Sequence, residues 1–118
     1  MSRTDSVFPV THDTYLKLFQ LSHPDLSKRW DTILFDEAQD ANPVTSAFVL
    51  NQPCRVILVG DRYQQIYRFR GADNALSAPQ LAQADRLWLT ASFRFGPEVA
   101  RMANILLERA GEEKRVTG

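Results

Sequence analysis

The sequence predicts an α/β fold built on a parallel sheet with flanking helices, and three consecutive segments near its middle carry this prediction. Residues 32–36 and 55–59 are short apolar runs rich in strand-forming side chains, and each ends in a polar turn. The second run is almost continuously apolar, which is typical of a parallel strand buried on both faces. Residues 43–51 between them have a helical pattern, so we expect a βαβ unit, whose crossover is right-handed in almost all cases.

The elements before this unit are a short strand and a helix. The apolar residues Val7, Phe8 and Val10 predict one short strand. Thr11 is a suitable N-cap for an amphipathic helix that ends near Ser22.

The elements after the unit are less regular. Residues 73–82 are expected to form a short helix, and residues 86–90, with Leu87, Trp88 and Leu89 at their centre, a third strand. Pro97 opens a final helix that runs to about Ala110, because Gly111 is a natural stop. The charged residues that follow are expected to fray.

Composition narrows the class of protein. The chain has 118 residues, enough for one modest domain, and a formal net charge of zero, so it has no overall basic field that would indicate nucleic-acid binding. The single cysteine, Cys54, excludes an internal disulfide and a four-cysteine metal site. No apolar stretch approaches the roughly 20 residues of a membrane span, and no signal pattern opens the chain. We therefore expect an intracellular protein.

The first candidate site is the acidic turn Asp36-Glu37 that follows the first central strand. Ligands of open α/β sheets bind outside the carboxyl ends of the strands. One carboxylate there can hold Mg²⁺, and its neighbour can orient or deprotonate a water that attacks a phosphate. A strand that simply ends in a solvated acidic turn explains these residues equally well.

The second candidate site follows the other central strand and spans residues 59–72. It contains an amide pair, two aromatic residues and three arginines, among them Tyr67, Phe69 and Arg70. Interleaved arginine and aromatic side chains suit a single nucleic-acid strand, because bases stack on rings while guanidinium groups bind phosphate. By composition alone the alternative is favoured, in which Tyr67 and Phe69 belong to the core and the arginines face water.

The third candidate site, residues 89–97, places Phe93 and Arg94 just ahead of the final helix. A ring and a guanidinium group in this position could contact a nucleobase and a phosphate. Taken alone, this pattern is weak.

Together, the order and spacing of the three sites resemble a helicase. Asp36-Glu37-Ala38-Gln39-Asp40 resembles motif II of the UvrD/Rep-type superfamily 1 DNA helicases, residues 59–72 resemble motif III, and residues 89–100 resemble motif IV. Phe69 and the residues around Phe93 are most similar to those of the F-box DNA helicase branch. The resemblance covers roughly residues 8–118 and implies a partial RecA-like (P-loop NTPase) sheet.

This resemblance implies a role for each residue at the nucleotide. Asp36 would bind the Mg²⁺ of Mg-ATP, and Glu37 would position the hydrolytic water. Gln64 would sense the γ-phosphate, Phe93 would pack on adenine, and Arg94 would reach the γ-phosphate from the second motor domain.

The resemblance also implies a partner and a domain organisation. Tyr67, Phe69 and Arg70 would lie near single-stranded DNA, with Phe69 as the stacking platform. Residues 1–90 would be the late part of the first motor domain, and residues 91–118 the start of the second. Gln39 and Asp40 belong to the motif, but no separate task follows for them.

The sequence departs from the family in one large respect. It contains no Gly-x-x-x-x-Gly-Lys-Ser/Thr phosphate loop, since none of its five glycines precedes such a pair. We therefore expect a fragment: the central ATPase segment of an ATP-dependent DNA helicase that translocates 3′ to 5′, inactive alone and dependent on the remainder of the helicase. The alternative is a non-catalytic remnant that binds single-stranded DNA or protein. The compartment would be cytoplasmic in a bacterium and nuclear in a eukaryote.

Overall fold

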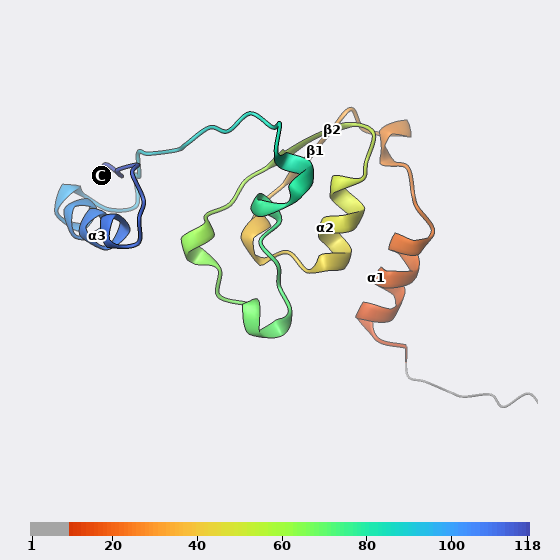
Figure 1. Cartoon of the computed structure of the whole chain (residues 1–118). Helices are drawn as coiled ribbons and strands as arrows, with labels where there is room; N and C mark the ends of the chain where they lie inside the picture. The colour runs from red at the N-terminus through yellow and green to blue at the C-terminus, as the bar shows by residue number, and fades with distance from the viewer. Residues whose placement is uncertain (1–9) are drawn as a thin grey trace, which may run out of the picture. The chain divides into compact units, whose positions relative to one another are not determined.

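The computed structural model describes residues 10–118, which form two compact units (Figure 1). The first unit ends at Gln83 and the second runs from Ala84 to Gly118. The short strand expected at Val7, Phe8 and Val10 falls largely outside the described residues.

The first unit contains the predicted strand–helix–strand sequence. Strands β1 (Thr32–Phe35) and β2 (Arg55–Leu58) pair in parallel, from Thr32 opposite Arg55 to Phe35 opposite Leu58. Helix α2 (Pro43–Leu50) connects them. Its first turn is capped by the Asn42 side chain, which accepts a hydrogen bond of 2.8 Å from the Thr45 backbone N–H. The order, the parallel pairing and Pro43 as the first helical residue are confirmed.

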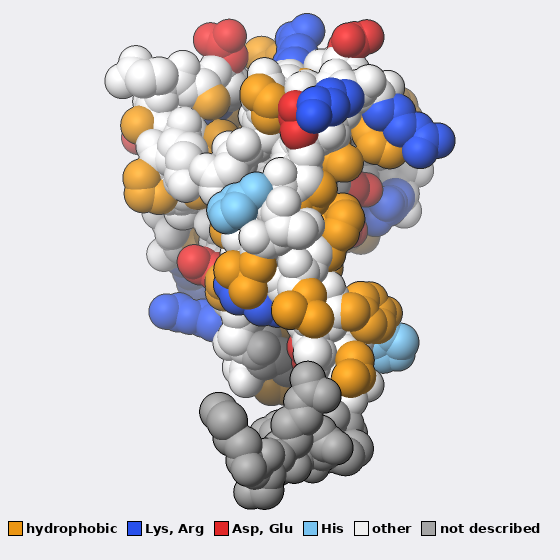
Figure 2. Space-filling view, turned by 90° about the vertical axis from the view of Figure 1, so that its right-hand side faces the viewer, with side chains coloured by type: hydrophobic (Ala, Val, Ile, Leu, Met, Phe, Trp, Pro, Cys, Tyr) orange, Lys and Arg blue, Asp and Glu red, His pale blue; other side chains and the backbone are white. Residues whose placement is uncertain are grey.

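Helix α1 (His12–Leu21) precedes the sheet and packs against α2. Thr11 occupies the predicted N-cap position, and the rings of Phe19 and Phe48 lie 5.2 Å apart between the two helices. The Gln52 side chain then holds the connection to β1, because its oxygen accepts a hydrogen bond of 2.8 Å from the backbone N–H of Leu26. Figure 2 shows hydrophobic and charged side chains mixed on the face that α1 presents.

The sheet is covered on one face. Side chains alternate between exposed and half-buried along both strands, so Phe35 and Leu58 face the core. On the other face, 73% of the surface of Leu34 and 37% of that of Ile57 are exposed to solvent. The expectation that β2 is buried on both faces is therefore wrong for the described chain, because no described element packs on the second face closely enough to cover it. The core is small: Ala38, Ala41 and Ala75 pack with Phe35, Leu58 and Leu76.

The segment after β2 consists of short 3₁₀ turns. They span Arg62–Gln64, Arg68–Arg70, Ala75–Ser77 and Pro79–Leu81. The predicted helix over residues 73–82 is wrong. Its pattern is interrupted at Ala78, which is extended (φ −62°, ψ 137°) because the ring of the following proline disfavours the helical region for the residue before it.

The second unit contains helix α3 (Pro97–Arg109), which confirms the predicted start at Pro97. Gly111 follows the helix with φ +82° and ends it. The backbone N–H groups of Gly111 and Glu112 donate to the carbonyls of Glu108 and Leu107, at 3.0 and 2.9 Å. This is a Schellman ending, in which a residue without Cβ adopts the left-handed conformation at no steric cost.

Two expectations for the second unit are wrong. Residues 86–90 form no strand, and Leu87 and Leu89 are 93% and 91% exposed, because only an isolated bridge between Ala91 and Thr117 lies beside this segment. The last residues do not fray either. The Asn104 side chain bonds both backbone groups of Val116, at 2.8 and 2.9 Å, and Thr117 donates to the carbonyl of Thr90 at 2.8 Å.

The uncovered sheet face predicts self-association of the isolated chain. Leu34 and Ile57 lie side by side in the register, and exposed apolar sheet surface tends to pair with a second copy. We expect the double variant Leu34→Thr and Ile57→Thr to weaken self-association about tenfold in sedimentation velocity, while the β-branched replacements keep the strands formed. Leu87→Thr is the control, because it removes an exposed leucine that belongs to no strand. An equal effect of both variants would contradict the assignment of the surface.

Candidate functional site

The candidate site lies where the two parallel strands end. The acidic turn follows Phe35 and the turn Val59-Gly60-Asp61 follows Leu58, so both lie at one edge of the sheet. Backbone pairing continues past the strands. The Val59 N–H donates to the Phe35 carbonyl at 2.8 Å, and the Ala38 N–H donates to the Val59 carbonyl at 3.0 Å. The first two candidate segments are therefore neighbours in space.

The acidic turn is built on an unusual backbone conformation at Glu37. This residue is left-handed (φ +51°, ψ +38°), which costs a residue other than glycine about 1–3 kcal/mol. The Glu37 N–H donates to the Asp36 carboxylate at 2.9 Å, and a 3₁₀ turn, Ala38–Asp40, follows at once. Both carboxylates stay exposed to solvent, while the next two side chains turn inward.

Gln39 is buried directly beneath the acidic turn. Only 1% of its surface is exposed to solvent, and it is the largest fully buried side chain among the described residues. Its Nε2 donates to Oε2 of Glu37 at 2.6 Å, and its Oε1 accepts from the Asp61 backbone N–H at 3.1 Å. One amide group thus joins the carboxylate at the end of β1 to the turn at the end of β2.

Gly60 makes room for this amide. A Cβ atom at position 60 would overlap Gln39 Oε1 and would lie 3.1 Å from the Ala38 backbone nitrogen. The glycine is thus required by close approach and not by an unusual φ.

Asp40 makes a second connection between the two segments. Its Oδ1 accepts hydrogen bonds from the backbone N–H groups of Ile66 and Tyr67, at 3.2 and 3.1 Å. The sequence pattern predicts no task for Gln39 and Asp40. Their membership in the motif was the available signal, since their partners at Asp61, Ile66 and Tyr67 lie more than twenty residues away in the chain and only folding brings them close.

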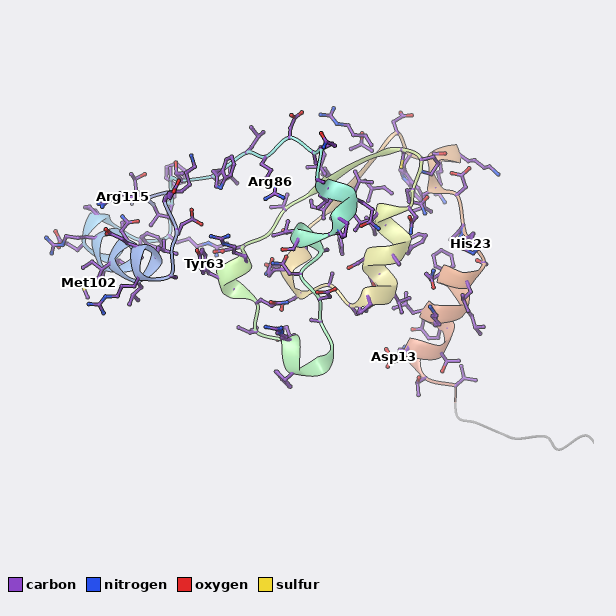
Figure 3. All side chains as sticks on the ribbon, viewed as in Figure 1. Asp13, His23, Tyr63, Arg86, Met102 and Arg115 are labelled. Atoms are coloured by element: carbon purple, nitrogen blue, oxygen red, sulfur yellow. The ribbon has the colours of Figure 1, made fainter. Side chains whose placement is uncertain are left out.

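The Gln64 side chain in the second segment is held by the carboxylate of Asp61. The Asp61 carboxylate accepts from the Tyr63 backbone N–H and from Gln64 Nε2, both at 2.9 Å. Arg62 lies 4.8 Å from the centroid of the Tyr63 ring and donates to its hydroxyl at 2.7 Å (Figure 3). Gln64 itself is exposed, so its amide lies at the surface beside the two turns.

The aromatic residues of the second segment are on the surface. Phe69 is 78% exposed to solvent and Tyr67 is 43% exposed. The centroids of the two rings lie 6.4 Å apart. The alternative in which both rings belong to the core is therefore wrong. Arg70 closes the Arg68–Arg70 turn, followed by Gly71 at φ +79°.

Phe93 and Arg94 belong to the second unit. Phe93 is fully exposed, and the Arg94 N–H donates to the Ser92 hydroxyl at 3.3 Å. The structure thus places Asp36, Glu37 and residues 64–70 within one unit, and Phe93 and Arg94 in the other.

Within residues 10–118, no group of three histidine, cysteine or acidic side chains could hold a metal ion. An exposed carboxylate such as Asp36 instead suits Mg²⁺, which keeps several waters and takes one or two protein carboxylates together with substrate phosphates.

None of the helices in the described part of the chain is long and apolar enough to cross a membrane.

Comparisons with known proteins agree with the pattern of motifs. Residues 11–80 match the UvrD/REP helicase N-terminal domain. The chain is 50% identical over 101 residues to F-box DNA helicase 1 of Gallus gallus, a match that covers 86% of this chain and 10% of the relative. It is 42% identical over 113 residues to F-box DNA helicase protein 1 of Schizosaccharomyces pombe (93% and 13%), and 31% identical over 88 residues to DNA helicase IV of Escherichia coli (68% and 13%). The chain spans about a tenth of the length of these relatives.

Proposed function

The chain belongs to the UvrD/REP helicase family and is similar to its F-box branch, and we propose that it is the central ATPase segment of an ATP-dependent DNA helicase. In this role it couples Mg-ATP hydrolysis to 3′-to-5′ movement on single-stranded DNA. The proposal rests on one observation. The hydrogen bonds made by the Gln39 and Asp40 side chains connect the acidic turn to the surface segment that contains Tyr67 and Phe69.

The acidic turn provides the catalytic groups. Bound Mg²⁺ supplies charge neutralisation at the phosphates. Asp36 would hold that ion directly or through a water, and Glu37 would orient the attacking water and accept its proton. Gln64, held by Asp61 at the neighbouring turn, would respond to the terminal phosphate.

The surface segment provides the DNA contacts. Exposed rings at Tyr67 and Phe69 offer faces on which bases stack, and Arg70 would pair with a backbone phosphate. The proposed partners are therefore single-stranded DNA and the remainder of the helicase, which supplies the phosphate loop.

The second unit contributes from another domain. Its exposed Phe93 would stack on adenine, and Arg94 would reach the γ-phosphate. In this proposal residues 1–90 belong to the first motor domain and residues 91–118 begin the second. The structural boundary between compact units lies a few residues earlier, at Gln83.

The first prediction concerns Glu37. The test protein is a chimera in which the chain replaces its aligned segment in the Gallus gallus relative, so that the phosphate loop is present. Glu37→Gln should keep ATP affinity within about twofold and lower kcat about 10²–10⁴-fold, because the amide keeps the shape and removes the base. Glu113→Gln, an exposed carboxylate of the second unit, is the control. Unchanged turnover in Glu37→Gln would remove this residue from the mechanism.

The second prediction concerns Phe69. Because its ring is 78% exposed, Phe69→Ala should leave the melting temperature nearly unchanged. A base–aromatic stack is worth about 1–3 kcal/mol, so affinity of the chimera for single-stranded DNA should fall about 5- to 150-fold. Phe93→Ala is the control: it removes another exposed ring and should raise the KM for ATP without changing DNA affinity. A large loss of stability with unchanged DNA binding would contradict the stacking role.

The third prediction concerns the 118-residue chain alone. It should show no sustained DNA-stimulated phosphate release, because it lacks the amides and lysine of a phosphate loop. In phosphoryl-transfer enzymes, an arginine contributed by a neighbouring domain or protein raises the rate of hydrolysis about 10³–10⁵-fold. Arg94 can supply such a group only from an ordered second domain. Turnover by the isolated chain that disappears in Glu37→Gln would contradict this prediction. DNA binding without turnover even in the chimera would favour the non-catalytic remnant.

A further inference from the structure

The buried amide of Gln39 satisfies two partners that no other side chain of its size can satisfy. The Asp61 backbone N–H is a donor, so the group facing it must accept; the Glu37 carboxylate is an acceptor, so the group facing it must donate. This requirement fixes the orientation of the amide, with Oε1 toward Asp61 and Nε2 toward Glu37. A glutamate here would face Glu37 with a second acceptor, and a leucine would leave both partners unbonded.

The Gln39 side chain is also confined. It is 1% exposed, and Gly60 lies so close that any Cβ there would overlap its Oε1. The neighbouring Ala38 is fully buried, and its N–H is bonded to the Val59 carbonyl at 3.0 Å. A shift of the Asp61 turn would therefore act on the confined Gln39 amide, which is bonded to the Glu37 carboxylate.

Asp40 makes a separate connection, to the backbone just before the aromatic residue Phe69. One of its carboxylate oxygens accepts from two consecutive backbone N–H groups, Ile66 and Tyr67. Hydrogen bonds to a charged acceptor are roughly twice as strong as neutral ones. The backbone of Tyr67, two residues before Phe69, is thus fixed to the turn Ala38–Asp40 that carries Gln39.

We propose that Gln39 and Asp40 are positioning residues that couple the Glu37 carboxylate to the aromatic surface segment, through the Asp61 turn and the Ile66–Tyr67 backbone respectively. This inference rests on the proposed function, since it assigns the two residues to coupling between nucleotide and DNA. It follows from a contiguous chain of bonds in one unit, and networks of this kind can carry energetic coupling between two sites.

The bonds are tested by amide hydrogen exchange on the full 118-residue chain. Gln39→Leu should speed exchange at Asp61 about tenfold, and Asp40→Ala should do the same at Ile66 and Tyr67, with α3 as the internal reference. Asp40→Asn is the matched variant, because its amide oxygen can still accept both bonds and should keep the protection. If Gln39→Leu unfolds the unit, Gln39→Glu and Gly60→Ala perturb the same bonds, because a Cβ at position 60 would overlap Gln39 Oε1. Unchanged protection at Asp61 and Tyr67 would overturn the proposal.

The coupling is tested in the chimera by the ratio of ATPase rates with and without single-stranded DNA. Asp40→Ala should lower this ratio about tenfold, and Asp40→Asn should restore most of it. Full DNA stimulation in Asp40→Ala, in an active chimera, would overturn the coupling role and leave the proposed ATPase function intact. An unmodified chimera without ATPase activity would overturn the proposed function itself, and the coupling with it.

Discussion

The candidate site depends on the pairing of β1 with β2 and on its continuation into the turns that follow. Backbone bonds from Val59 to Phe35 and from Ala38 to Val59 bring two polar turns together that are separated by more than twenty residues of sequence. The buried amide of Gln39 then bonds across the same gap. Without this parallel pairing, neither the acidic turn nor its connection to the surface aromatics would exist.

Hydrogen bonds contribute an unusually large share of the stability of the first unit because its hydrophobic core is small. Its fully buried members are mainly alanines, which let two backbones approach closely but bury little apolar area. A buried polar group that loses its partner costs about 1–3 kcal/mol, a large share of the stability of a unit this size. The strained backbone of Glu37 is kept by the same bonds that hold its carboxylate in place.

The sequence by itself determined the regular elements of the fold. Both strands, their parallel order, α1, α2 and α3 with its glycine ending follow from local patterns: apolar periodicity, Thr11 and Pro43 at helix starts, and Gly111 at a helix end. The order of three motifs also indicated the family. These features are local or depend on order along the chain, which is why they can be read without coordinates.

Tertiary structure alone decided where the remaining side chains lie. It placed Phe69 on the surface, where composition favoured the core, and it replaced the expected strand at residues 86–90 with exposed chain, because a strand needs a partner to bond. It also gave Gln39 and Asp40 their partners. Burial and long-range hydrogen bonds depend on which segments meet in space, and residue type and spacing along a chain do not specify that.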